Sequence, residues 1–206
     1  MNGKFIVIEG LDGSGKTTQL TALAQNLRAL GYAVAETAEP TASTTGGLAR
    51  DALSGFTPRT GAEIAALFMA DRVAHNVNPI NGIGKLLSEG RVVLCDRYYY
   101  SSLAYQGTVT DPEWVFRINI DCPEIRKPDL CVFLDLDDEE CLRRMEQGRS
   151  YREIYENENS LLAVRQRYYE IFRRLEHRDR ICIVNAARTP EEVAADVLSA
   201  VKSVLD

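Results

Sequence analysis

Short apolar runs recur along the chain, separated by longer stretches in which apolar residues return every three or four positions. Within the short runs the apolar residues are nearly continuous, a pattern typical of parallel strands that are buried on both faces. These runs predict strands at residues 4–9, 33–38, 91–96, 129–136 and 180–186.

The stretches between the runs have helical periodicity. The first predicts a helix over residues 15–30, ended by Gly31, whose apolar face consists of Leu20, Leu23, Ala24, Leu27 and Leu30. The last stretch opens with Thr189 and Pro190, residue types preferred at the N-cap and at the first helical position. Further helices are predicted at 46–54, over one long stretch at 60–89, near residue 101, and at 111–120, 138–147, 157–177 and 190–204.

The alternation of strands and helices indicates the fold class. We expect an α/β three-layer sandwich, in which helices joined by right-handed crossovers cover both faces of a five-stranded parallel sheet. Residues 1–206 contain no internal repeat and no linker, so we expect a single domain. The stretch 148–159 is polar and rich in both charges, which fits either a solvated helix face or a mobile lid.

Composition narrows the class of protein. Of the 206 residues, 45% are hydrophobic and 26% are charged, and no apolar run approaches the roughly 20 residues of a membrane span. The net charge of −6 argues against a general nucleic-acid binder, because such binding depends on Lys and Arg neutralising phosphates. A small anion held in a local basic pocket remains compatible with this charge.

The cysteines bear on the compartment. They are five in number and form no C-x-x-C pair, and three of them, Cys95, Cys131 and Cys182, lie inside predicted strands. We therefore expect all five, with Cys122 and Cys141, to be buried free thiols. Because disulfides form mainly in oxidising compartments, this predicts a cytoplasmic protein.

A glycine-rich segment between the first strand and the first helix has a specific chemistry. Gly10-Leu-Asp-Gly-Ser-Gly-Lys-Thr matches G-x-x-x-x-G-K-[ST], the phosphate-binding P-loop. Its glycines allow backbone N–H groups to surround an anion, while Lys16 is placed to reach the β- and γ-phosphates and Thr17 to bind Mg²⁺. The alternative is a glycine-rich turn with an incidental Gly-Lys-Thr. The residues predicted to bind ATP here are Gly10, Leu11, Asp12, Gly13, Ser14, Gly15, Lys16, Thr17 and Thr18.

The third predicted strand ends in Asp96 and Arg97. A carboxylate at the end of a strand next to the P-loop strand is placed to hold Mg²⁺, and Arg97 is suited to bind a second phosphate through bidentate hydrogen bonds. The alternative is a helix-capping Asp followed by a surface Arg. The chain contains no N-K-x-D motif for reading guanine, which disfavours a GTPase.

Motif-bearing segments follow one another across most of the chain: IEGLDGSGKTTQ, LFMADRVAH, DRYYYSSLAYQG, KPDLCVFLDLD and NAARTPEEV. This set resembles the thymidylate kinase family of nucleoside monophosphate kinases. The resemblance implies a P-loop NTPase fold, transfer of the γ-phosphoryl group of ATP with Mg²⁺ to dTMP in dTTP biosynthesis, and a homodimer. The chain departs from the family at Ala38-Glu39-Pro40-Thr41, where many members have R-E-P-G-G-T.

The resemblance also implies roles at the acceptor nucleoside. Phe68 would stack on thymine and Arg72 would donate to a base carbonyl. Both side chains can enter one pocket, because residues at i and i+4 of a helix share one face. The alternative for Phe68 is the ordinary core. Asp12 would meet the 3′-hydroxyl of the sugar, and Tyr105 would crowd its 2′ position and so favour deoxyribose.

Arginines would bind the phosphates. Arg97 would bind the acceptor phosphate with Arg50 assisting, in a site lined also by Ser101, Ser102 and Gln106. Arg144 would contact adenine, together with residues 185–190. The residues expected to act in catalysis are Asp12, Lys16, Arg97, Arg149 and Arg152.

The two last arginines belong to the stretch 148–159, which corresponds to the lid of the family. Arg149 and Arg152 would close over the transferred phosphoryl group. The alternative is that they only pair with acidic neighbours on a solvated helix, namely Glu146, Glu153 and Glu156.

Two other functions stay open at this point. One is a kinase for another (deoxy)nucleotide or for a deoxynucleoside. The other is a nucleotide-binding regulator that holds ATP without acceptor chemistry. This function is disfavoured by the presence of Lys16, Thr17, Asp96, Arg97 and the two lid arginines.

Overall fold

The structure is a computed structural model of the chain and describes residues 3–148 and 158–205, with side chains described at 3–145 and 161–205. The two predicted lid arginines, Arg149 and Arg152, lie outside the described residues, so their predicted role rests on the sequence.

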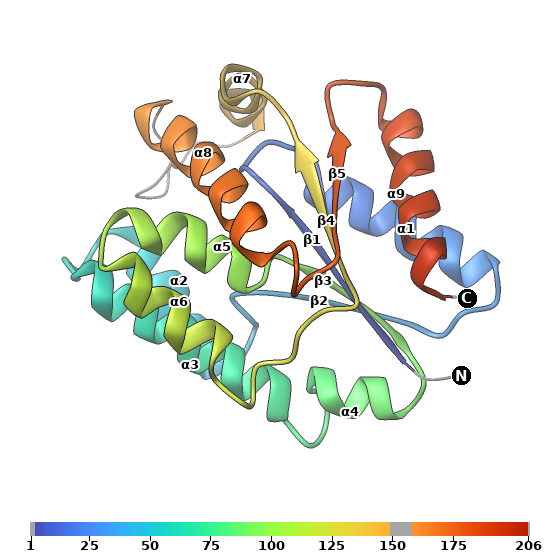
Figure 1. The fold of residues 1–206 in the computed structure, drawn as a ribbon, viewed down its shortest axis with the longest axis horizontal. Coiled ribbons are helices and arrows are strands. Elements are labelled where there is room, and N and C mark those ends of the chain that lie inside the picture. The colour runs from blue at the N-terminus through green and yellow to red at the C-terminus, as the bar shows by residue number, and fades with distance from the viewer. Residues whose placement is uncertain (1–2, 149–157, 206) are drawn as a thin grey trace.

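A five-stranded parallel sheet forms the centre of the described part of the chain (Figure 1). Its strands are β1 (Lys4–Gly10), β2 (Val34–Ala38), β3 (Val92–Asp96), β4 (Leu130–Asp135) and β5 (Ile181–Asn185), in the spatial order β2-β3-β1-β4-β5. Ile8 pairs with Asp96 and Gly10 with Leu134, so β1, β3 and β4 end close together. Ligands of open α/β sheets bind at this carboxyl edge.

Helices cover both faces of the sheet. On one face lie α1 (Lys16–Ala29) and α9 (Pro190–Leu205), and on the other lie α5 (Tyr99–Tyr105) and α8 (Glu158–Leu175). The other helical segments are α2 (Thr44–Ser54), α3 (Gly61–Val77), α4 (Ile83–Ser88), the 3-10 turn η1 (Gln106–Thr108), α6 (Pro112–Ile120) and α7 (Asp138–Gly148). This arrangement confirms the predicted α/β three-layer fold.

The predicted single helix over 60–89 is wrong, because α3 ends at Val77 and α4 begins at Ile83. Asn78 precedes Pro79, and a residue before proline is pushed out of the helical region; its ψ is 122°. Asn78 Oδ1 then accepts from the backbone N–H of Ile80 at 2.9 Å, which stabilises the turn. A Cβ at Gly82 would lie 2.5 Å from the Asn78 carbonyl oxygen, so the turn also requires glycine there.

The core lies on both sides of the central strands, where Val7 and Ile8 of β1 and Val132 of β4 are fully buried. All five cysteines are free, as predicted. The prediction that all are buried is wrong for Cys122 and Cys182, which are half-buried. Cys182 lies on β5, at the edge of the sheet, where one side of the strand has less cover.

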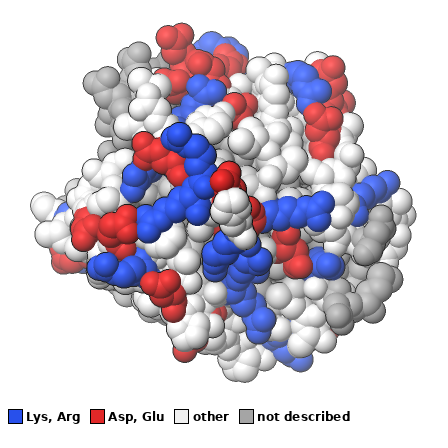
Figure 2. All heavy atoms as spheres, in the orientation of Figure 1, with Lys and Arg blue, Asp and Glu red and all other residues white. Residues whose placement is uncertain are grey.

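The surface charges are mixed. Figure 2 shows acidic and basic side chains next to one another over one face of the molecule. Ion pairs join some elements. For example, Arg174 of α8 pairs with Glu113 of α6 at 2.6 Å. Among the helices of the described residues, none is long and apolar enough to cross a membrane.

Candidate active site

The glycine-rich loop between β1 and α1 has a backbone that only glycine adopts readily. Gly10, Gly13 and Gly15 have φ values of 152°, 83° and 93°. A Cβ at Gly13 would lie 2.4 Å from the carbonyl oxygen of Cys141 in α7, so this glycine also allows a close approach between two segments. The loop leads directly into the N-terminus of α1, where backbone N–H groups favour an anion.

Lys16 lies beneath this loop, and its side chain is 7% exposed. Its Nζ donates to the Leu11 carbonyl oxygen at 2.8 Å and lies 3.8 Å from Asp12 Oδ1. Burial lowers the pKa of Lys16, and the nearby Arg97 adds to this effect. A buried ammonium group with one weak ion pair is suited to gain an anionic ligand.

Thr17 and Asp96 form a second part of the site, because Thr17 Oγ1 donates to Asp96 Oδ2 at 3.2 Å. The other carboxylate oxygen, Asp96 Oδ1, is buried and has no hydrogen-bond partner among the described residues. A hydroxyl and a partly unsatisfied carboxylate fit Mg²⁺, which in kinase sites is held by few protein ligands and by substrate phosphates. The described residues contain no cluster of three or more His, Cys, Asp or Glu that would hold a metal unaided.

Arg97 follows Asp96 and has an unusual backbone, with φ at 67°. Its guanidinium donates to Asp12 Oδ1 at 2.5 Å and to Ser101 Oγ at 2.9 Å. It also lies 5.2 Å from the centre of the Tyr105 ring. Although burial opposes it, the charge of Asp12 raises the pKa of Arg97, which keeps the guanidinium protonated.

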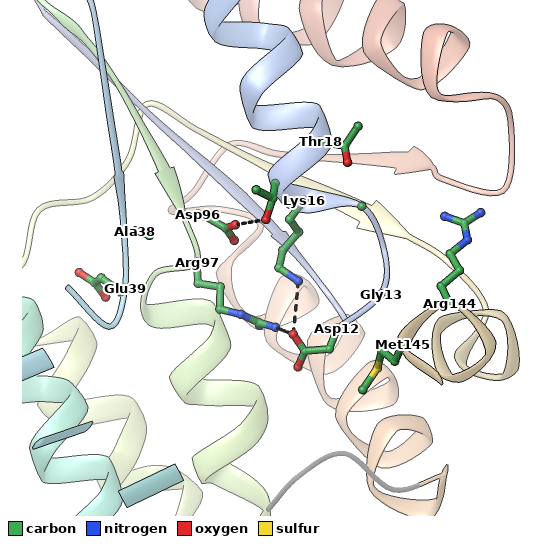
Figure 3. Close-up of a pocket in the computed structure, with 12 residues that line it drawn as sticks. Asp12, Gly13, Lys16, Thr18, Ala38, Glu39, Asp96, Arg97, Arg144 and Met145 are labelled. Carbon is green, nitrogen blue, oxygen red and sulfur yellow. Dashed lines mark hydrogen bonds and ion pairs between the residues drawn. The ribbon is translucent and has the colours of Figure 1, made fainter. Parts of the chain in front are cut away.

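Asp12 is the meeting point of these groups (Figure 3). Lys16 and Arg97 converge on one carboxylate oxygen. The Tyr105 hydroxyl donates to the other carboxylate oxygen at 3.3 Å. Burial and the charge of Asp12 raise the pKa of Tyr105, so the phenol stays a hydrogen-bond donor. The structure thus brings together residues predicted for the donor site and for the acceptor site.

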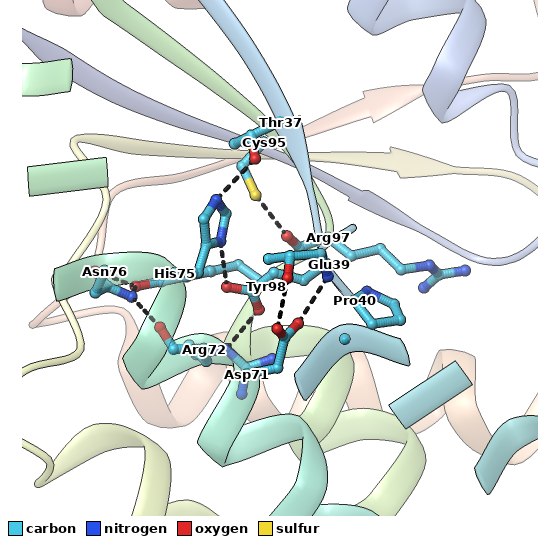
Figure 4. A network of polar contacts seen from close by, with 12 residues as sticks. Thr37, Glu39, Pro40, Asp71, Arg72, His75, Asn76, Cys95, Arg97 and Tyr98 are labelled. Atoms are coloured by element: carbon cyan, nitrogen blue, oxygen red, sulfur yellow. Dashed lines mark hydrogen bonds and ion pairs between the residues drawn. The ribbon is translucent and has the colours of Figure 1, made fainter. Parts of the chain in front are cut away.

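Phe68 and Arg72 lie on α3, and both are buried. Arg72 Nε donates to Glu39 Oε2 at 2.8 Å and Nη2 to Ser102 Oγ at 3.1 Å, while Nη1 donates to Asn119 Oδ1. Glu39 also contacts His75 Nδ1 at 2.9 Å, which links the end of β2 to α3 (Figure 4). Arg72 is therefore held in one orientation from several sides.

The unusual segment after Glu39 is held by Asp71 of α3. Asp71 accepts from the backbone N–H of Thr41 at 2.7 Å and from the hydroxyls of Thr41, Ser43 and Thr45. Burial acts in the opposite direction, but these hydrogen bonds lower the pKa of the Asp71 carboxyl. Side-chain hydroxyls thus fix the loop that follows Glu39 and Pro40.

The P-loop, Asp96 and Arg97 border a pocket of about 560 Å³ at the carboxyl edge of the sheet. Its lining residues are Asp12, Gly13, Gly15, Lys16, Thr17, Thr18, Ala38, Glu39, Asp96, Arg97, Arg144 and Met145. Most of the predicted ATP and metal ligands are among them. Gly10, Leu11 and Ser14 are not, and Leu11 and Ser14 are 1% and 2% exposed.

Of the predicted acceptor residues, Asp12 and Arg97 line this pocket, and the others are not among its lining residues. Ser101 and Tyr105 of α5 contact Arg97 and Asp12, and Ser102 contacts Arg72. Gln106 is buried, and its Oε1 has no hydrogen-bond partner within the described ranges. Arg50 points elsewhere, since its Nη1 donates to the carbonyl oxygens of Pro40 and Thr41.

Comparison with known proteins decides the family. The thymidylate kinase family model matches residues 8–197. A probable thymidylate kinase of Pyrococcus horikoshii is 40% identical over 211 residues, covering 100% of this chain and 98% of that protein. A thymidylate kinase of Pelotomaculum thermopropionicum is 38% identical over 215 residues, covering 100% and 96%. The chain belongs to the thymidylate kinase family.

Within this thymidylate kinase fold, Glu39, Met145 and Glu9 are site residues that the sequence analysis missed. Glu39 and Met145 line the pocket, and Glu9 accepts a hydrogen bond from the backbone N–H of Tyr98, the residue after Arg97. The sequence contained a signal for Glu9, because a charged residue that directly follows the apolar run of residues 5–8 within the predicted strand 4–9 is unusual. Met145 had no such signal, since a methionine on a helix is usually core.

Proposed function

We propose that the protein transfers the γ-phosphoryl group of ATP to the 5′-phosphate of dTMP, giving dTDP and ADP. The observation that carries this proposal is the convergence of Lys16 from the P-loop and Arg97 from the end of β3 on Asp12, beside one pocket. Two cations from separate elements suit a reaction that joins two anionic substrates. Family membership supports the same activity.

On the donor side, the P-loop N–H groups and Lys16 would bind the β- and γ-phosphates of ATP. Thr17 and Asp96 would hold Mg²⁺, which would neutralise charge on those phosphates. Thr18 and Arg144, which line the same pocket, would contact the rest of the donor nucleotide. Arg144 is now paired with Glu140 at 2.8 Å, so donor binding would compete with an exposed ion pair of small energy.

On the acceptor side, Arg97 would exchange Asp12 for the phosphate of dTMP. An oxygen of that phosphate then attacks the γ-phosphorus, and the bond to the β-phosphate oxygen breaks with ADP as the leaving group. The acceptor oxygen is already anionic, so no strong general base is required. Catalysis consists mainly of alignment and charge neutralisation, shared by Lys16, Arg97 and, as the family resemblance implies, by the arginines of the lid at 148–159.

Asp12 and Tyr105 would read the acceptor sugar. Once Arg97 binds phosphate, Asp12 is available to accept a hydrogen bond from the 3′-hydroxyl. Tyr105 is 6% exposed and its hydroxyl contacts Asp12, so its ring would border the 2′ position and disfavour ribose.

Phe68 and Arg72 would read the acceptor base. Arg72 is held by Glu39, Asn119 and Ser102, which leaves the second N–H of each terminal nitrogen for a thymine carbonyl. Ser102, Gln106 and Arg50 would complete the acceptor site, with Arg50 turning from the loop carbonyls to the phosphate.

Assembly and location are proposed on the family resemblance and on sequence. We propose a homodimer in the cytoplasm, formed from single-domain subunits that do not bind nucleic acid. Light scattering after gel filtration measures the mass directly, and a mass equal to one chain contradicts the dimer.

An ADP-release assay over several acceptors tests the activity. We expect turnover with dTMP to exceed that with dUMP, dCMP, UMP and thymidine by at least about tenfold, the discrimination that a few pocket contacts provide. A better rate with thymidine would indicate a nucleoside kinase. ADP release that is independent of every acceptor would overturn the proposal.

A further inference from the structure

Glu9 is a carboxylate buried in the core, with 0% exposure, and it has no part in the proposed binding of either substrate. It lies next to the end of β1, after the fully buried Val7 and Ile8. Burying a carboxylate is unfavourable unless it is paired and hydrogen-bonded. A position of this kind in an apolar strand therefore indicates a function for the charge or for its hydrogen bonds.

The carboxylate of Glu9 accepts hydrogen bonds on both oxygens. Oε1 accepts from the backbone N–H groups of Tyr98 at 2.8 Å and Ser101 at 3.2 Å. Oε2 accepts from Ser101 Oγ at 2.7 Å and from the Tyr168 hydroxyl at 2.8 Å. Glu9 thus connects β1 with the start of α5 and with α8.

Two residues of β1 hold the backbone around Arg97. Its φ of 67° is a left-handed conformation that is unfavourable for a residue with a side chain and persists only where the surroundings fix it. The N–H of Arg97 donates to the Ile8 carbonyl oxygen at 3.0 Å, and the next N–H, of Tyr98, donates to Glu9. Both peptide groups that flank the Arg97 Cα are therefore bound by consecutive residues of β1.

The side chain of Arg97 is connected to Glu9 as well. Its Nη1 donates to Ser101 Oγ, and that hydroxyl donates to Glu9 Oε2. The same carboxylate thus limits the backbone of Arg97 directly and the direction of its guanidinium through one intervening hydroxyl.

We propose that Glu9 is a positioning residue for Arg97: it fixes the left-handed turn at Arg97 and, through Ser101, aims the guanidinium at the acceptor phosphate. This inference rests on the proposed function for the nature of the acceptor. Glu9 does not touch the substrate itself, and its effect on turnover passes through Arg97.

The test compares two replacements of Glu9. Glu9→Gln keeps an oxygen for the Tyr98 and Ser101 N–H groups, so we expect kcat/KM for dTMP within about threefold of wild type. Glu9→Met has similar length but no such acceptor, and we expect a loss on the order of 100-fold, the effect of displacing a reacting group by about 1 Å. KM for ATP and the melting temperature of Glu9→Gln should stay unchanged.

Tyr168→Phe is the matched control. It removes a donor to Glu9 Oε2 and a contact with Ser101 Oγ at 2.9 Å, and it leaves both bonds to Oε1 and the bond from Ser101 Oγ to Oε2, so kcat/KM should change by less than about threefold. A loss as large as that of Glu9→Met would show that the network acts through α8 and would overturn the proposal.

A double-mutant cycle separates positioning from a general role in the core. In an Arg97→Ala background, Glu9→Met should lower kcat/KM by less than about threefold further, because Arg97 is no longer there to be positioned. A full further loss would contradict the proposal.

If Glu9→Met does not fold, the Glu9→Gln variant decides the question. A folded Glu9→Gln protein whose kcat/KM is more than about tenfold below wild type overturns the proposal.

The conformation of Arg97 provides a readout that does not depend on the reaction. In a crystal structure of Glu9→Met, or of Glu9→Leu where that variant folds better, we expect Arg97 to leave the left-handed region and its contact with Asp12 to be lost. Absence of dTMP phosphorylation by the wild type would refute the proposed function alone. An unchanged Arg97 in the variant would refute the positioning role alone.

Discussion

Asp12 contacts Lys16, Arg97 and Tyr105 in the structure, although each of these four residues is proposed to bind a substrate. Such contacts keep the buried charges compensated until ligands arrive, because a buried charge without a partner is costly. Substrate phosphates would therefore replace Asp12 as the partner of the two cations. Substrate binding would exchange one ion pair for another. The net free energy of binding would therefore depend on the geometry of the contacts more than on charge.

Lys16 gives the first prediction at the scale of single residues. Lys16→Ala should lower kcat by at least about 100-fold, because it removes a preorganised charge at the transferred phosphoryl group. Lys202→Ala, on the exposed side of α9, is the matched control and should leave the rate unchanged. Steady-state kinetics of both proteins measures this, and a Lys16→Ala rate close to wild type would contradict the phosphate-binding role.

Tyr105 gives the second prediction at this scale. Tyr105→Ala should narrow the preference for dTMP over its ribose counterpart by about tenfold, because the ring no longer excludes a 2′-hydroxyl. Tyr105→Phe removes only the hydroxyl that contacts Asp12 and should keep the preference. Competition between the two nucleotides measures the ratio, and an unchanged ratio in the alanine variant would remove Tyr105 from this role.

At the scale of elements, the loop after β1 depends on how closely α7 approaches it. Gly13→Ala should weaken ATP binding by about tenfold or more and lower the melting temperature, because its φ of 83° strains any side chain and its Cβ would lie 2.4 Å from Cys141 O. Gly47→Ala in α2 is the control, since a Cβ there meets nothing within 4 Å in the described part of the chain. It should stabilise the protein by about 0.5–1 kcal/mol.

Calorimetry measures the stability of both variants, and titration with ATP measures their affinity for the nucleotide. If Gly13→Ala binds ATP as tightly as wild type, the loop conformation described above is not required for the nucleotide.

The segment between α7 and α8 carries the prediction on the lid. Arg149→Ala and Arg152→Ala should lower kcat while dTMP affinity stays nearly intact, because these side chains are expected to act on the transition state. Arg143→Ala, which removes an exposed pair with Glu140, is the control and should change stability by only about 0–1 kcal/mol. Normal kcat in both lid variants would leave only the solvated-helix interpretation.

Elements that depend on local sequence were predictable. The P-loop motif fixes its own backbone through glycine positions, and apolar runs located every strand to within a residue or two. The break between α3 and α4 was missed because apolar periodicity continues across it, and Ile80, which fits that periodicity, is 81% exposed in the turn. Pro79 and Gly82 were the sequence signals for this break, and their effect outweighs the apolar periodicity.

At the scale of the whole molecule, contacts between distant segments were beyond the sequence. Glu9 meets Tyr168 and Arg72 meets Asn119 only because the sheet order and helix packing bring β1, α3, α6 and α8 together. The spacing of residues along the chain says nothing about these distances. The motif therefore predicts which residue types bind the phosphates, and the fold adds which residues hold those side chains in place.

The central claim is that the γ-phosphoryl group of ATP moves to dTMP. The most direct measurement incubates the purified protein with Mg²⁺, dTMP and ATP labelled in the γ-phosphate, and separates the products. The account predicts label in dTDP, with formation of labelled dTDP abolished in Lys16→Ala. Label that accumulates in inorganic phosphate at the same rate with and without dTMP would contradict it.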